Sequence, residues 1–128
     1  MQWKSRLRDL LHDCAASGPS EQADRVADAA ELLCIDTPSV QEKLRVGACE
    51  SAVMEIIGGE TSFMLSRGGS GRCLATVVLP DGSEEVISEG STLALALLAA
   101  HLSALLEDAD MSGVTTDGVA FAAGLRAN

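Results

Sequence analysis

The alternation of apolar and polar residues is most regular in the second half of the chain. Residues 61–67, 72–79 and 83–89 have the lengths and residue types of short β-strands, and turn residues separate them. Asp81 and Gly82 form a two-residue hairpin signal between the second and third runs, because both residue types tolerate the positive φ angles of such a turn. The pattern therefore predicts a three-stranded antiparallel meander.

The same turn predicts which side chains share a face of the sheet, because successive residues of a strand point to opposite sides. One face should carry Ala75, Val77, Leu79, Glu84 and Val86. The other face should carry Leu74, Thr76, Val78, Glu85 and Ile87.

Helical spacing of apolar residues predicts four helices around these strands. They cover residues 2–16, 20–35, 38–57 and 92–107. Thr37 and Pro38 form a strong start signal for the third helix, since a capping side chain precedes a residue that needs no amide donor. We expect Gly47 to bend or split that helix, and Ser91 or Thr92 to cap the last one.

The second predicted helix has two distinct faces. We expect Ser20 to cap it. Its inward face should consist of Val26, Ala27, Ala30, Leu33 and Cys34. Its outward face should be an acidic stripe made of Glu21, Asp24, Asp28 and Glu31.

These elements predict an α+β fold in which N-terminal helices precede a three-stranded antiparallel meander and a C-terminal helix. A chain of 128 residues has the length of one domain. We assign residues 1–108 to a single α+β domain, with a helical part over 1–57 and a βββα part over 61–107. Residues 109–128 are small and polar, and we expect them to form a loose tail.

Composition narrows the classes of function. Aromatic residues make up 2% of the chain, which disfavours sites that stack sugars or bases on aromatic rings. The cysteines at positions 14, 34, 49 and 73 lack the short spacings of zinc or redox motifs. No signal peptide and no membrane-spanning apolar run is recognisable. We therefore expect a cytoplasmic protein without membrane association, whose cysteines are free and mostly buried.

Residues for catalysis are scarce. His12 and His101 are the only histidines, and His12 lies on the far side of a helix from Cys14. Acidic residues are abundant, but no pair is singled out for acid–base chemistry. We therefore expect a protein that is not an enzyme and that has neither cofactor nor metal site.

The net charge of −10 disfavours binding to phosphates. The strand–turn–strand–helix pattern resembles the second half of a double-stranded RNA-binding domain, a family that holds phosphates with lysines at the start of its last helix. The matching positions here, from Thr92 to Ala96, contain no basic residue. Direct binding to RNA is therefore not expected.

A second resemblance concerns roughly residues 48–108. A helix ending near Gly58, three strands and a capped Ala/Leu helix resemble the phage ABA-sandwich family of small helix–sheet–helix proteins. The residues that carry the likeness are Leu79, Pro80, Asp81, Gly82, the run from Gly90 to Leu97, Ala99 and Ala100. The resemblance implies a phage or prophage origin and supplies no catalytic residues.

Two functional hypotheses follow. In the first, the chain is a phage inhibitor of the anti-CRISPR or anti-defence type. It would bind a basic, nucleic-acid-handling host protein, with a CRISPR effector subunit as one candidate, because carboxylates can take the place of phosphates. The candidate binding residues form two acidic patches: Asp81, Glu84, Glu85 and Glu89 on the hairpin, and Glu21, Asp24, Asp28 and Glu31 on the second helix.

In the second hypothesis, the chain is a structural or assembly subunit of a phage-like particle that pairs through apolar helix faces. Its acidity would then only maintain solubility, and the chain itself would be a monomer or a homodimer. Salt distinguishes the two hypotheses, since raised salt weakens binding between opposite charges far more than apolar pairing.

Overall fold

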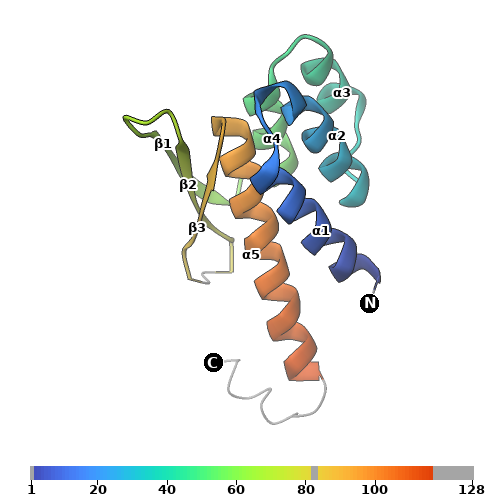
Figure 1. The fold of residues 1–128 in the computed structure, drawn as a ribbon. Coiled ribbons are helices and arrows are strands. Elements are labelled where there is room, and N and C mark those ends of the chain that lie inside the picture. Colours follow the sequence, from blue (N-terminus) through green and yellow to red (C-terminus); the bar gives the residue numbers. More distant parts are fainter. Residues whose placement is uncertain (1, 82–83, 117–128) are drawn as a thin grey trace.

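Helices, a three-stranded sheet and a long final helix follow one another along the chain, which confirms the predicted α+β class (Figure 1). The computed structural model describes residues 2–81 and 84–116. The elements are α1 (Gln2–Ala16), the 3₁₀ turn η1 (Pro19–Glu21), α2 (Gln22–Leu32), α3 (Pro38–Arg45), α4 (Cys49–Ile57), β1 (Ser62–Arg67), β2 (Cys73–Val78), β3 (Val86–Gly90) and α5 (Leu93–Thr116).

The sheet is an antiparallel meander in the order β1-β2-β3, as predicted. Val77 pairs with Val86 and Thr76 pairs with Ile87, so the predicted register is also confirmed. The strands begin or end at other residues than expected, and β3 begins at Val86 because Glu84 and Glu85 are not part of the strand. The inner face of the sheet, which carries Ala75, Val77 and Val86, packs against α5 and is buried. The outer face, which carries Met64, Leu74 and Ile87, is exposed.

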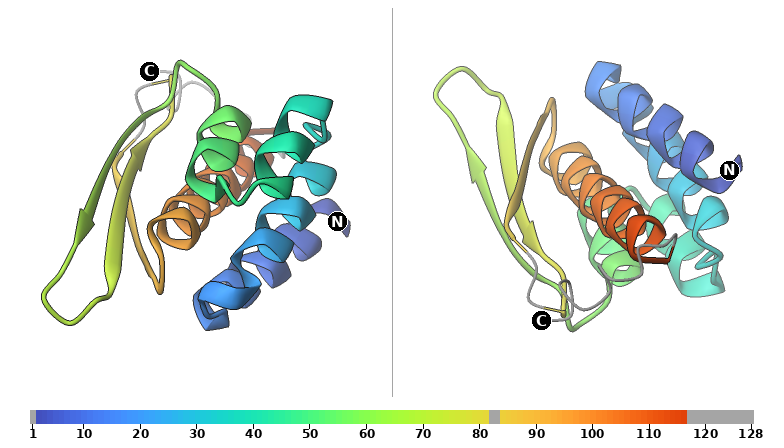
Figure 2. Two further views of the ribbon diagram at one scale, coloured as in Figure 1. Left: turned by 90° about the horizontal axis from the view of Figure 1, so that it is seen from above. Right: turned by 90° about the horizontal axis from the view of Figure 1, so that it is seen from below.

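Helix α5 lies between the sheet and the other helices, and Figure 2 shows it in the middle of the three layers. It packs against β2 and β3 on one side and against α1, α2 and α4 on the other. Every residue from Ala94 to Leu102 is buried, which explains why this helix is apolar all round rather than amphipathic. Among the described residues, no helix is both long and apolar enough to cross a membrane.

Helix α2 differs from its prediction at both ends. It begins after η1 with Glu21 as its N-cap, not Ser20, and the Glu21 carboxylate accepts the Gly18 backbone N–H at 2.8 Å. It ends at Leu32 because the chain turns at Cys34, where φ is 60°.

The earlier end of α2 also corrects the predicted inward face. Cys34 lies outside the helix and is exposed, Ala27 is exposed, and Leu33 is only half-buried. The buried residues of the helix are Val26, Ala29, Ala30 and Leu32. They recur every three to four residues, as one helix face requires.

The predicted third helix is split in two at Gly47. This residue has φ +83°, a conformation that L side chains rarely adopt, and it lies between α3 and α4. The Thr37 Oγ1 accepts the Val40 backbone N–H at 3.1 Å, so the predicted cap of α3 is confirmed. Glu55 of α4 joins the two helices by accepting hydrogen bonds from Lys43 at 2.7 Å and Ser39 at 2.8 Å, and these bonds lower its pKa.

Helix α5 continues to Thr116, so residues 109–116 are helical instead of belonging to a loose tail. Asp110 pairs with Lys4 of α1, which lowers the pKa of the Asp110 carboxyl and ties this part of α5 to the N-terminal helix. The rest of the predicted tail, 117–128, lies outside the described residues, as does the Gly82 of the hairpin turn.

All four cysteines are free, and three of them are buried as expected: Cys14, Cys49 and Cys73. Burial raises the pKa of the Cys14 thiol to about 12 and also raises the pKa of Cys49. Cys34 is the exposed one, because it lies just beyond the end of α2.

We expect a thiol reagent at about pH 8 to label one cysteine quickly in the native protein and all four after denaturation. Thiolates react much faster than thiols, and Cys34 is exposed whereas Cys14, Cys49 and Cys73 are buried. Mass spectrometry after a short labelling pulse measures the number of modified sites. Cys34→Ser should abolish the fast reaction and Cys49→Ser should leave it unchanged; fast labelling of two or more sites would contradict this assignment.

Candidate functional site

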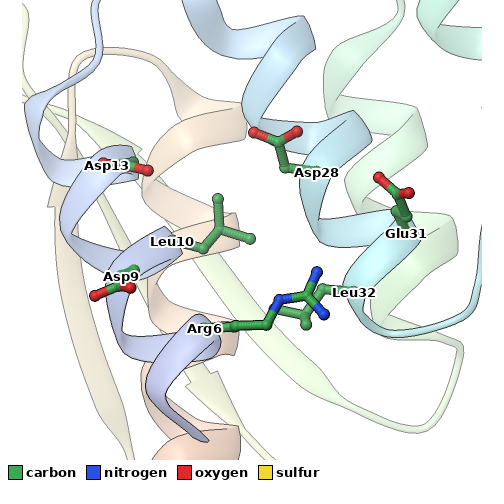
Figure 3. A pocket seen from close by; sticks show the side chains of 7 residues that line it. All are labelled: Arg6, Asp9, Leu10, Asp13, Asp28, Glu31 and Leu32. Atoms are coloured by element: carbon green, nitrogen blue, oxygen red, sulfur yellow. The ribbon is translucent and has the colours of Figure 1, made fainter. Parts of the chain in front are cut away.

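The acidic stripe predicted on the second helix exists on the surface of the protein. Glu21, Asp24, Asp28 and Glu31 are all exposed. Glu21 precedes α2, and its carboxylate is engaged by the Gly18 backbone N–H, so it has a capping role. Asp28 and Glu31, in contrast, line a groove between α1 and α2 (Figure 3).

This groove, which we call the α1–α2 groove, has a volume of about 270 Å³. Its walls come from two helices that are separated in the chain by the η1 turn. Its lining residues are Arg6, Asp9, Leu10, Asp13, Asp28, Glu31 and Leu32 (Figure 3). Two exposed helix faces that look ordinary in isolation thus form one concave acidic surface.

Arginine side chains partly neutralise the groove. The Arg25 Nη1 lies 3.6 Å from the Asp13 Oδ2 and 3.5 Å from the Asp28 Oδ2, so it holds the two helices together at one side. Arg6 contributes a second guanidinium to the lining. The carboxylates of Asp9, Asp13, Asp28 and Glu31 outnumber these two cations, and the groove keeps a net negative charge.

Apolar and polar side chains are both present in the groove. Leu10 and Leu32 are buried residues of the core that also line it. Among the described residues, no three His, Cys, Asp or Glu side chains are gathered so that they could hold a metal ion. The geometry therefore suits a long cationic side chain, whose aliphatic stem can lie on the leucines while its charged end meets carboxylates.

The hairpin patch is divided by the structure. Asp81, Glu84 and Glu85 are exposed around the β2–β3 turn. Glu89 lies near the other end of β3, about 10 Å from Val86 along the extended strand. Its carboxylate faces Arg72 at 3.3 Å across the sheet. The four predicted residues are thus not brought together as one site.

Sequence reasoning missed the contribution of α1. Arg6, Asp9 and Asp13 recur at helical spacing on the polar side of the first predicted helix, which was a usable signal. That signal does not show that the polar side faces α2, because the relative rotation of two helices depends on how both pack on α5.

No protein-family model, no curated protein and no solved structure matches this chain.

Proposed function

We propose that this protein is a non-enzymatic inhibitor or adaptor that binds a basic, nucleic-acid-handling protein through the α1–α2 groove. The observation that carries the proposal is the convergence of Asp9 and Asp13 from α1 with Asp28 and Glu31 from α2 on one concave surface. Asp24 extends this surface along α2.

The physical basis is charge complementarity. A protein that handles nucleic acid presents lysine and arginine side chains where phosphates bind. A rigid array of carboxylates on two helices offers negative charge to the same side chains and steers the encounter. The apolar stems of those side chains find Leu10 and Leu32 in the groove.

We also propose a phage or prophage origin for this protein and a host origin for its partner. The likeness of the βββα part to the phage ABA-sandwich family favours a phage or prophage protein that acts on a host protein in the cytoplasm. A subunit of a CRISPR effector fits this description, since it is basic where it holds nucleic acid.

A second candidate function is assembly through apolar surfaces. The apolar helix faces that would carry it are buried in the core, where Val26, Val53 and Leu98 are fully covered. Among the described residues, three exposed apolar side chains lie on the outer face of the sheet: Met64, Leu74 and Ile87. Pairing with another subunit would therefore use that face.

Charge reversal in the groove tests the first proposal. We expect Asp24→Lys, Asp28→Lys and Glu31→Lys together to weaken partner binding at least tenfold, about 1.4 kcal/mol, because like charges would then meet across the interface. The partner is first captured from a bacterial lysate on the wild-type protein and identified by mass spectrometry. Its affinity is then measured by calorimetry with purified components.

The matched control carries Glu84→Lys and Glu85→Lys, which change charge on the other acidic patch. We expect this control to bind normally, both variants to melt within a few degrees of the wild type, and nucleic acid to compete with the protein for its partner. Unchanged affinity in the groove variant, or a wild-type affinity insensitive to salt, would contradict the proposed function.

A further inference from the structure

The first strand of the sheet, β1, has a free edge. Among the described residues it contacts only β2 and α5, whereas β3 at the other edge of the sheet also contacts α1. Figure 1 shows β1 at the margin of the molecule, and both views in Figure 2 agree. Proteins usually protect such an edge from other strands with charged side chains, proline or a bulge. The segment from Ser62 to Ser66 has none of these.

The β1–β2 hairpin determines which backbone groups lie on this edge. The Gly68 N–H donates to the Arg72 C=O at 2.8 Å, so these two residues form a hydrogen-bonded pair of the antiparallel ladder. Hydrogen-bonded and non-hydrogen-bonded pairs alternate along such a ladder. Every second residue of β1, counted back from Gly68, therefore directs its backbone groups at β2. The N–H and C=O groups of Phe63 and Leu65 point the other way, to the free edge.

The side chains of β1 have a symmetric pattern about Met64. Phe63 and Leu65 flank it and are half-buried on the face that packs against α5. Ser62 and Ser66 come next on either side, and both are exposed. The order of polar and apolar residues is thus the same in both directions along the strand. A second, antiparallel copy of this strand matches that order residue by residue.

From this free edge and its symmetric pattern, we propose that β1 pairs antiparallel with β1 of a second copy of this chain. The two-fold axis passes through Met64 and is perpendicular to the sheet, so Phe63 of each copy lies opposite Leu65 of the other. Each of these two pairs exchanges two backbone hydrogen bonds, because both residues have their free groups on this edge. The two three-stranded sheets then form one continuous sheet, with both α5 helices on the same side.

The side chains favour this register. Each Phe63–Leu65 pair brings together two half-buried apolar side chains from strands about 5 Å apart, which removes them further from water. Arg67 at the end of one strand comes to the start of the other, beside Glu60. Both are exposed, and neither has an ion partner among the described residues. Opposite charges thus lie at both ends of the paired strands.

The size of the contact predicts how strong this pairing is. Only one strand of each copy takes part, and a six-residue strand is about 20 Å long, so the interface is smaller than that of a standard stable complex. The dimer should therefore form reversibly and depend on protein concentration. This inference does not rest on the proposed function, because among the described residues β1 contacts neither of the helices that form the α1–α2 groove.

Sedimentation equilibrium between about 10 μM and about 1 mM tests the proposal. The mean mass of the wild-type protein should rise with concentration from 13.2 kDa toward twice that value. Met64→Lys should weaken the dimer at least tenfold, because two lysines would lie directly opposite each other at the axis. Met64 is 72% exposed, so the folded monomer should keep its melting temperature within a few degrees. The matched control Ile87→Lys changes a residue that is 61% exposed on the same face of β3, and it should dimerise normally.

Cysteine cross-linking tests the register, in a Cys34→Ser background that removes the exposed native thiol. Met64→Cys should form a disulfide-linked dimer quickly under mild oxidation, since the Cα atoms of a non-hydrogen-bonded pair lie about 4.5 Å apart. Ser62→Cys alone should not, because its partner in this register is Ser66 of the other copy. A mixture of the Ser62→Cys and Ser66→Cys proteins should cross-link.

The outcomes separate the parts of the proposal. A wild-type protein that stays monomeric up to the highest concentration would overturn it. So would a dimer that Met64→Lys leaves intact, or one that Ile87→Lys breaks. Cross-linking of Ser62→Cys alone as fast as Met64→Cys would overturn the stated axis. Groove variants should leave the mass unchanged, so failure here is distinguishable from failure of the proposed function.

Discussion

Gly90→Ala is expected to destabilise the protein by about 3 kcal/mol, because the added methyl group has no space between β3 and α5. A Cβ at position 90 would lie 2.6 Å from the Ala96 backbone N and 3.0 Å from the Ala96 Cα. These atoms belong to the buried start of α5 and cannot rotate away. The strand must therefore separate from the helix, or the helix must shift in the core.

The measurement is denaturant unfolding followed by circular dichroism, with the free energy of unfolding extrapolated to water. Gly59→Ala is the matched control, because no heavy atom lies within 4 Å of its added Cβ and its φ is not in the left-handed region. We expect that control to change stability by less than about 1 kcal/mol. A loss of less than 1 kcal/mol in the Gly90 variant would show that β3 and α5 are less closely packed than the structure has them.

His101 is expected to make stability depend on pH below neutrality. It lies in the buried part of α5 with 5% of its surface exposed. Burial lowers the pKa of its imidazole from 6.5 to about 4. Among the described residues its Nδ1 has no hydrogen-bond partner, so no hydrogen bond at that atom offsets the cost of charging the ring.

The direction of the effect follows from proton binding. The unfolded chain takes up a proton near pH 6.5, whereas the folded protein resists it until about pH 4. The stabilisation is therefore complete above pH 6.5 and is lost as the pH falls toward 4. The difference between these pKa values corresponds to about 3 kcal/mol.

His101→Leu isolates this contribution. Carboxyl groups with lowered pKa values, such as those of Glu42, Glu55 and Asp110, also lose stabilisation in acid, but they do so in both proteins. The difference in unfolding free energy between wild type and variant should change by about 3 kcal/mol between pH 7 and pH 4. The variant should be at least as stable as the wild type at pH 7, since it removes an unpaired buried polar atom. Parallel pH curves would show that His101 is not buried as a neutral ring.

Much of the fold could be predicted because its signals are local. The Asp81-Gly82 turn predicted both a hairpin and its register, and Thr37 with Pro38 predicted the start of α3. Such signals depend on the φ preferences and hydrogen bonds of adjacent residues, which distant parts of the chain do not alter. The end of α2 was not predicted because no local signal marks it. Leu33, Cys34 and Ile35 are apolar, and none of them is a residue that typically ends a helix.

The candidate site was only half predictable. Asp28 and Glu31 stood out as part of an acidic stripe, but Asp9 and Asp13 did not, because a polar helix face is ordinary in any single helix. Conversely, Glu89 was grouped with Glu84 and Glu85 because they are close in sequence. Glu89 lies near the far end of β3, whereas Glu84 and Glu85 precede the start of that strand. Closeness along an extended strand is not closeness on the surface.

The local sequence pattern predicted the three strands, their antiparallel order and which side chains share each face of the sheet. Which face of the sheet is buried and which helix faces meet follows from the packing of the elements on one another. Helices α1 and α2 both pack against α5, and their carboxylates line one groove. Helix α5 also covers one face of the sheet and leaves Met64 and Ile87 exposed on the other. The reason is that local pattern specifies which residues avoid water, whereas the partner that covers each apolar face is chosen by packing among all the elements at once.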